Sequence, residues 1–188
     1  MNYCTRCGAN TVYMTPPADN RRRHVCRLCG FIHYENPKIV CGCLVRSGER
    51  VLLCQRAIDP RKHMWTFPAG FLERGETTRE GAIRETKEEA CAEVTVAQLY
   101  IQFDLSYISQ IYQFYLTDLA GSFGRGEETL DARLFSESDI PWNELAFPVV
   151  RETLQYYFQD RQRDHFEFRH VEIPDRSVWI GRTTASTT

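Results

Sequence analysis

The sequence predicts an α/β domain with a mixed β-sheet, preceded by a small cysteine-bearing segment. Two closely spaced cysteine pairs lie within the first 30 residues, and short apolar runs then alternate with helical patterns up to about residue 160. The chain of 188 residues is 43% apolar and 26% charged, a composition that can bury a core and is not typical of disorder. Its length suits one medium domain with a small appendage.

The cysteine pairs occur in the segments "CTRCG" and "CRLCG" and comprise Cys4, Cys7, Cys26 and Cys29. Each CxxC turn can aim two thiolates at one point, and two such turns make the all-sulfur shell that structural zinc prefers. Disulfides are the first alternative, disfavoured in a reducing compartment, and a redox pair is the second, disfavoured by the duplicated spacing. Four sulfurs leave no open coordination position, so we expect structural Zn²⁺. The other cysteines show no ligand spacing and are expected to be small apolar residues.

The sequence after the cysteine-bearing segment predicts interleaved strands and helices. Residues 38–46 and 50–57 form two apolar runs around a turn and indicate an antiparallel hairpin, residues 94–103 and 110–119 are β-rich, and residues 148–160 carry an apolar stripe of helical period. We therefore expect a zinc ribbon at residues 1–33 and a main domain at residues 34–160. Residues 161–188 are expected to be a C-terminal extension with a disordered tail.

A helix is predicted over residues 78–90. Thr77 and Glu80 make a T-x-x-E capping box, in which two side chains satisfy backbone N–H groups that have no partner inside the helix. Apolar or near-neutral side chains follow at offsets that suit packing on a sheet.

Three glutamates, Glu85, Glu88 and Glu89, share one side of this helix. Like charges at this spacing destabilise an isolated helix. Lys87 is not three or four positions from any of them, and Arg84 alone cannot compensate all three. A solvated acidic face is one interpretation. The other is a site for Mg²⁺ or Mn²⁺, which prefer oxygen ligands and bind alongside substrate phosphates.

The segment "GFLERGETTREGAIRETKEEACA" resembles the Nudix box. The positions that match its pattern are Gly70, Glu76, Arg84, Glu85, Glu88 and Glu89. Thr86 replaces the usual aliphatic residue, and Cys91 replaces the closing glycine, which leaves open how the helix ends. The resemblance implies an α/β/α sandwich and a hydrolase that cleaves the pyrophosphate of a nucleoside diphosphate linked to another group.

The resemblance also implies roles for individual residues. The three helix glutamates and the Ala69 carbonyl would hold the catalytic cations, Arg84 would orient Glu85, and Glu76 would fix the loop, with a surface role as its alternative. The general base would be a glutamate of the box or one on a distant loop. For the loop we expect Glu128, with Glu127 as its rival and a solvated turn as the alternative for both.

Substrate class is indicated by the ribbon, which resembles that of the NADH pyrophosphatases and of a group that includes plant-type FAD pyrophosphatases. We therefore expect a nucleotide such as FAD, ADP-ribose or NADH, cleaved to release AMP. Arg56 is a candidate phosphate ligand or a surface arginine. Tyr107, Tyr112 and Phe31 are candidates to stack on adenine or to lie in the core.

A binding module without turnover is the competing hypothesis. Three arginines in "NRRRH" at residues 20–24 could contact nucleic acid, but such a module would not need every acid of the box. A net charge of -2 gives no global attraction to nucleic acid or to a membrane. No apolar run approaches the roughly 20 residues that span a bilayer. The start "MNYCTRCGAN" lacks the apolar core of a signal peptide, so a cytoplasmic protein is expected. A homodimer is left open.

Overall fold

The computed structural model describes residues 1–95 and 97–175. The chain divides into two compact units, one of Met1–Pro37 and one that begins at Lys38. The sequence suggested a division between residues 33 and 34. Residues 34–37 belong to no strand and connect the last strand of the first unit to the first strand of the second.

The first unit is a three-stranded antiparallel sheet. Its strands lie in the order β1 (Thr11–Met14), β2 (Arg23–Cys26) and β3 (Ile32–His33). Gly8 and Gly30 adopt left-handed φ values of 75° and 68°, and their N–H groups donate to the carbonyl oxygens of Cys4 and Cys26. A β-carbon is unfavourable at such φ values, which explains a glycine after each cysteine pair.

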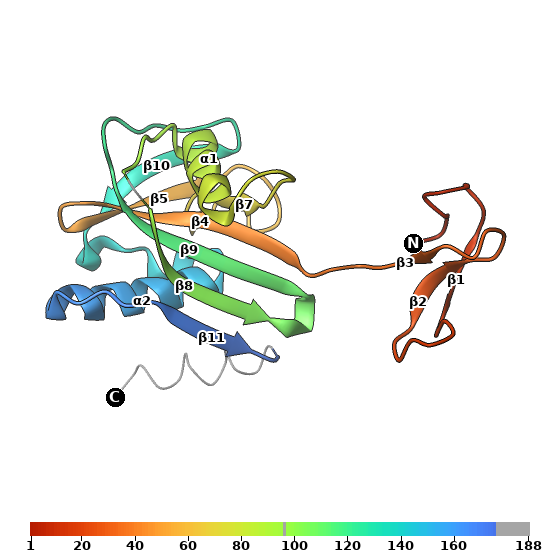
Figure 1. Ribbon diagram of the computed structural model, residues 1–188. Coiled ribbons are helices and arrows are strands. Elements are labelled where there is room, and N and C mark those ends of the chain that lie inside the picture. Colours follow the sequence, from red (N-terminus) through yellow and green to blue (C-terminus); the bar gives the residue numbers. More distant parts are fainter. Residues whose placement is uncertain (96, 176–188) are drawn as a thin grey trace. The chain divides into compact units, whose positions relative to one another are not determined.

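The second unit is built on an eight-stranded sheet (Figure 1). Six strands follow the order β10-β5-β4-β9-β8-β11, while β6 pairs with β5 and β7 with β4. The β4–β9 and β8–β11 pairs are parallel and the other pairs are antiparallel, so the predicted mixed sheet is confirmed. The strands are β4 (Lys38–Ser47), β5 (Arg50–Arg56), β6 (Trp65–Thr66), β7 (Ala69–Phe71), β8 (Gln98–Leu105), β9 (Gln110–Asp118), β10 (Thr129–Phe135) and β11 (Arg169–Ile173).

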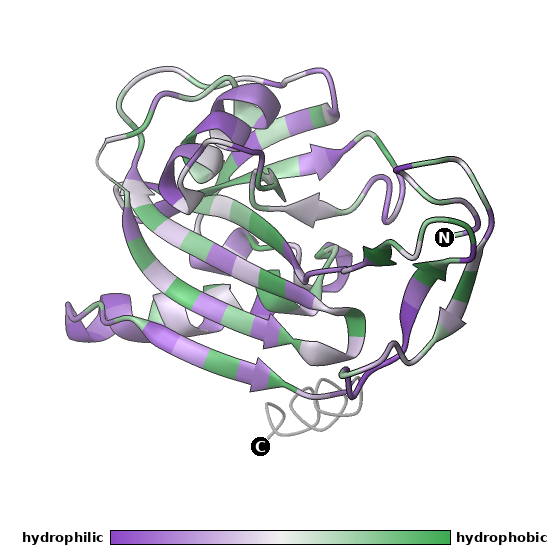
Figure 2. Ribbon diagram, turned by 45° about the vertical axis from the view of Figure 1, so that its right-hand side comes forward, coloured by the Kyte–Doolittle hydropathy of each residue, from purple (hydrophilic) through white to green (hydrophobic). Residues whose placement is uncertain are grey.

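Two helices cover the sheet, α1 (Thr78–Ala90) on one face and α2 (Pro148–Arg163) on the other (Figure 1). Successive side chains of a strand point to opposite faces. Along β4, Cys43 and Val45 accordingly pack in the cluster under α1, and Leu44 packs in the cluster under α2. Figure 2 shows alternating hydrophobic and hydrophilic bands along the long strands. The predicted α/β/α sandwich is confirmed.

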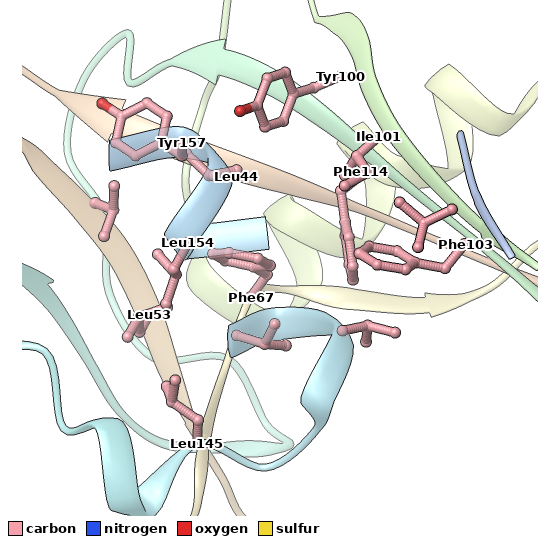
Figure 3. Close-up of a cluster of buried hydrophobic side chains, with 14 of the residues drawn as sticks. Leu44, Leu53, Phe67, Tyr100, Ile101, Phe103, Phe114, Leu145, Leu154 and Tyr157 are labelled. Atoms are coloured by element: carbon pink, nitrogen blue, oxygen red, sulfur yellow. The ribbon is translucent and has the colours of Figure 1, made fainter. Parts of the chain in front are cut away.

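The larger core lies between the sheet and α2 (Figure 3). The apolar stripe predicted for the helix consists of Val150, Leu154, Tyr157 and Phe158, and all four side chains are buried. They belong to one cluster with Leu44 and Phe114 of the sheet and with Phe67, which lies between β6 and β7. Pro148 occupies the first helical position, where its missing N–H costs nothing. The helix continues to Arg163, so the boundary expected at residue 160 falls inside it.

Strand β11 lies in the segment for which the sequence suggested only an extension. It pairs in parallel with β8. Arg169 on β11 donates two hydrogen bonds to Asp160 of α2, at 2.5 and 2.6 Å, and Tyr100 of β8 donates a third at 2.7 Å. Asp160 is only 2% exposed, so these partners compensate a buried charge. The expected disordered tail at residues 181–188 lies outside the described residues.

Among the described residues, no helix combines the length and apolar character that a membrane crossing requires.

Candidate functional site

Helix α1 presents its glutamates because its other side is fixed on the sheet. The capping box is confirmed, since Thr77 Oγ1 accepts from Glu80 N at 3.2 Å and Glu80 Oε2 accepts from Thr77 N at 2.7 Å. The side that packs on the sheet holds the buried residues Gly81, Ala82, Thr86 and Ala90. Helical geometry then places the three glutamates away from the sheet core, beside β7.

A cleft of about 950 Å³ opens at this helix. Acidic side chains predicted from the sequence line one part of it, namely Glu85, Glu88, Glu89, Glu127 and Glu128. Arg56, Arg84, Ala69 and Gly70 also line the cleft, so the fold brings most of the predicted site residues together. Glu76 is not part of this lining but contacts Arg84, which is.

Arg84 connects the loop before α1 to the glutamates on the helix. Its Nε and Nη2 atoms donate to the two carboxylate oxygens of Glu76 at 3.0 and 2.9 Å. Nη1 donates to Glu85 at 2.7 Å and to Glu88 at 3.1 Å, and Nη2 also reaches the carbonyl of Phe71 at 3.2 Å. One arginine therefore contacts three carboxylates, more than the sequence suggested, and a bidentate pair fixes its orientation.

The electrostatics of Glu76 and Glu89 differ. The Arg84 guanidinium and the Glu73 N–H lower the pKa of Glu76 to about 2. Burial raises the pKa of Glu89 to about 7, against a hydrogen bond of 3.1 Å from Ala69 N and the nearby charge of Arg56. Burial also raises the pKa of Glu85. Burial disfavours the charged form of a carboxylate, and a cation beside it favours that form. These buried carboxylates therefore suit a cation site.

Glycines permit the close contacts of this site. A β-carbon on Gly70 would lie 2.3 Å from the Glu85 carboxyl group, and one on Gly81 would lie 2.7 Å from Cys41 Sγ and 2.8 Å from Glu76 Oε1. Gly70 therefore lets Glu85 approach strand β7.

The cleft also has a mostly apolar wall, most of whose residues the sequence did not indicate. Arg56 rests over the Phe147 ring at 5.3 Å and donates to the Pro60 carbonyl at 2.9 Å. Tyr112 also lines the cleft, whereas Tyr107 and Phe31 do not. The other apolar residues are Val40, Ile58, Pro60, Phe71, Phe114, Val149 and Val150. Among these residues, only Phe147 had a local signal in the sequence. It stands immediately before Pro148, and a proline is common at the first position of a helix.

The four cysteines of the ribbon converge as the spacing predicted. Their sulfurs lie within 4.8 Å of one another, with Cys4 and Cys29 at 3.8 Å and Cys7 and Cys26 at 3.4 Å. The backbone N–H groups of Cys29 and Leu28 point at Cys26 Sγ and lower its pKa to about 6. N–H groups aimed at sulfur stabilise the thiolate that binds metal.

Cys91 ends α1 in the left-handed conformation at φ 47°, so this cysteine adopts the geometry usually given to glycine.

The arginine cluster at residues 20–24 has partners nearby. Arg22 donates to the Tyr13 carbonyl at 2.7 Å and lies over its ring, and Arg23 forms an ion pair with Asp19 at 3.1 Å. Both arginines therefore have partners within the ribbon.

Comparison with known families agrees with this division of the chain. The family model described as "NUDIX domain" matches residues 36–157. A second model, described as "Nudix N-terminal", matches residues 2–35.

Relatives include an NAD-capped RNA hydrolase NudC of Vibrio vulnificus, which is 30% identical over 145 residues, or 75% of this chain and 53% of the relative. An ADP-ribose pyrophosphatase of Methanocaldococcus jannaschii is 29% identical over 119 residues, or 61% of this chain and 69% of the relative. The chain thus spans about half the length of the NudC relatives it matches.

Solved structures share the fold. A NUDIX hydrolase from Nitrosomonas europaea superposes with a TM-score of 0.86 at 40% identity, over 92% of this chain and 100% of that one. An ADP-ribose pyrophosphatase from Streptococcus suis gives a TM-score of 0.60 at 22% identity, over 72% of this chain and 99% of that one, which shows the fold alone.

Proposed function

Because this chain belongs to the NUDIX domain family, we propose that it hydrolyses the pyrophosphate of a nucleotide linked to a second group, with AMP as one product. The observation that supports this proposal most is the cleft, whose lining combines the five predicted glutamates with apolar and aromatic side chains. Carboxylate oxygens suit divalent cations, which in turn bind phosphates, and apolar and aromatic side chains suit a ring. A substrate with a charged pyrophosphate and flat rings therefore matches both kinds of lining residue.

The donor atoms fit two different metals. Glu85, Glu88 and Glu89 offer only oxygen in a cleft lined by two arginines and six glutamates, which suits Mg²⁺ or Mn²⁺. We propose these three side chains as ligands, with the Ala69 carbonyl joining them. The ribbon offers only sulfur, which suits structural Zn²⁺. Eight unpaired cysteines also support a reducing, cytoplasmic setting.

The bound divalent ions would supply charge neutralisation at the pyrophosphate and acidify a water. The protein's own residues do the remaining work. Glu85 is held by Arg84 and Glu89 by the Ala69 N–H, so both are oriented before substrate arrives. Glu128, or its neighbour Glu127, would accept the proton of the attacking water. Arg56 would contact a substrate phosphate.

The substrate we propose is a dinucleotide or nucleotide sugar of the FAD, ADP-ribose or NADH type. About 950 Å³ is ample for such a ligand, since pockets for drug-sized ligands occupy roughly 300–1,000 Å³. Tyr112 and Phe147 can contact a ring of the substrate, and Arg56 lies over Phe147. The names of the relatives, NAD-capped RNA hydrolase and ADP-ribose pyrophosphatase, support the same class.

A substrate panel tests this proposal. The full chain is incubated with Mg²⁺ and with FAD, NADH, ADP-ribose or capped RNA, and the products are identified by mass spectrometry. We expect AMP from at least one of the first three substrates. If none of the four is cleaved and RNA binding depends on salt, the chain is a binding module instead.

A further inference from the structure

The segment 121–128 lies against the C-terminal end of α1 and carries the two loop glutamates. The last carbonyl groups of a helix have no partner inside it and need donors from elsewhere. Here Gly124 N donates to the Ala90 carbonyl at 2.7 Å, and Gly126 N donates to the Glu89 carbonyl at 2.9 Å. The loop therefore completes the backbone hydrogen bonds of the same helix that presents the acidic cluster.

Three more contacts hold this segment in place. Cys91 Sγ donates to the Arg125 carbonyl at 3.5 Å, which links the loop to the residue that ends the helix. Phe123 packs on the core cluster that contains Ala90. Beyond the glycines, the Glu128 carbonyl accepts from Ala57 N at 2.8 Å. The backbone that carries the loop glutamates is thus attached at both ends.

Gly126 differs from Gly124 in one steric respect. A β-carbon on Gly126 would lie 1.7 Å from the Glu88 carbonyl oxygen and 2.8 Å from the Glu88 carbonyl carbon, which are backbone atoms that cannot rotate away. On Gly124 the nearest atom would be Cys91 Cβ at 3.9 Å, an ordinary contact. Only residue 126 must be glycine for the loop to lie against the helix.

We propose that Gly126 is a positioning residue of the hydrolytic site. By letting the loop backbone contact α1, it sets where Glu127 and Glu128 lie relative to the helix glutamates. The inference rests on the proposed function for its catalytic consequence. Misplacement of a catalytic group by about 1 Å can cost roughly 100-fold in rate, so the hydrogen bond from residue 126 controls kcat without touching the substrate.

The test compares Gly126→Ala with its matched control, Gly124→Ala, in the full chain with Mg²⁺ and whichever nucleotide the wild type cleaves. We expect Gly126→Ala to lower kcat by ~10- to 100-fold while KM changes less than about twofold, because the apolar wall is untouched. Gly124→Ala should stay within about twofold of wild type. Adding Gly126→Ala to Glu128→Gln, or to Glu127→Gln if that is the base, should cause no further loss.

Hydrogen exchange supplies a readout that does not depend on turnover. We expect faster exchange of the amides of residues 124–126 in Gly126→Ala and unchanged exchange in Gly124→Ala. If Gly126→Ala fails to fold, Phe123→Ala removes another loop contact without a clash and should lower kcat in the same direction.

Unchanged exchange, or faster exchange with wild-type kcat, would overturn the inference. A wild-type protein that releases AMP from none of the nucleotides would instead count against the proposed function, and the exchange comparison would still decide whether Gly126 holds the loop.

Discussion

Gly70 and Glu85 approach so closely that a β-carbon at residue 70 would lie 2.3 Å from the Glu85 carboxyl carbon. Such a separation does not occur between non-bonded carbon atoms, so the Glu85 carboxylate keeps this place only while residue 70 has no side chain. The strand end where Gly70 lies therefore determines where a carboxylate of α1 can lie.

We expect Gly70→Ala to push the Glu85 carboxylate away and to weaken Mg²⁺ binding by roughly 10- to 100-fold, the usual effect of misplacing a metal ligand. Isothermal titration with Mg²⁺ and a non-hydrolysable nucleotide measures this. Gly121→Ala is the matched control, because a β-carbon there meets nothing within 4 Å. Equal Mg²⁺ affinity in the two variants would contradict the expectation.

Glu76→Gln tests whether the bidentate pair with Arg84 orients the site. Because Arg84 also holds Glu85, we expect kcat to fall about 10- to 100-fold although residue 76 does not line the cleft. Steady-state kinetics measures the effect, with Glu93→Gln, an exposed residue outside the cleft lining, as the acidic control. A Glu76→Gln enzyme with wild-type kcat would show that the pair has only a local role.

Glu88→Gln tests the metal assignment directly. The Glu88 side chain is 58% exposed, so replacing its carboxylate with the glutamine amide should leave the thermal midpoint of unfolding nearly unchanged. We expect turnover to fall roughly 100-fold or more, because a neutral amide is a poor ligand for Mg²⁺. Glu93→Gln, an exposed residue after the helix, is the control. Normal hydrolysis by Glu88→Gln would show that residue 88 is not a ligand.

Glu89 gives the Mg²⁺-free protein a distinctive pH dependence. Burial raises the pKa of Glu89 from 4.5 to about 7, so between these values the folded state binds a proton that the unfolded state releases. This contribution to stability is full below pH 4.5 and is lost as pH rises through 7. Its upper limit is about 3 kcal/mol, at ~1.4 kcal/mol per pH unit between the two pKa values.

Denaturant titrations from pH 5 to 8 without divalent ions measure this contribution, and Mg²⁺ affinity should rise over the same interval. The Glu89→Gln variant is the control and should show a flatter profile. Glu76 does not interfere, because its pKa is lowered to about 2 and its stabilisation is lost only as pH falls below 4.5. A wild-type profile that matches Glu89→Gln would contradict this expectation.

The ribbon should depend on zinc for its fold. We expect one Zn²⁺ per chain by native mass spectrometry, and a zinc-selective chelator should increase hydrogen exchange across residues 1–37 while the β-sheet core stays protected. Cys26→Ser should lose the metal, whereas Cys91→Ser, outside the cluster, should retain it. Full zinc retention in Cys26→Ser would exclude the four-cysteine site.

Several features could be predicted from the sequence because they depend on residues that are close together in the chain. The spacing of Cys4, Cys7, Cys26 and Cys29, the Thr77–Glu80 capping box and the shared side of the three helix glutamates all follow from fixed distances along the chain. CxxC turns and 3.6-residue periodicity act within a few positions. The strands around residues 38–57 and the apolar stripe of α2 could be predicted for the same reason.

Only the tertiary structure decided the rest of the site and the C-terminal strand. Phe147 and Arg56 are far apart in sequence, yet β5 and the start of α2 place them on one wall of the cleft. Strand β11 gave no strong signal, and its place depends on Arg169 reaching Asp160. The need for glycine at residue 126 arises only where its loop meets the end of α1. Short-range patterns carry no information about such long-range contacts, because these depend on how separate elements pack.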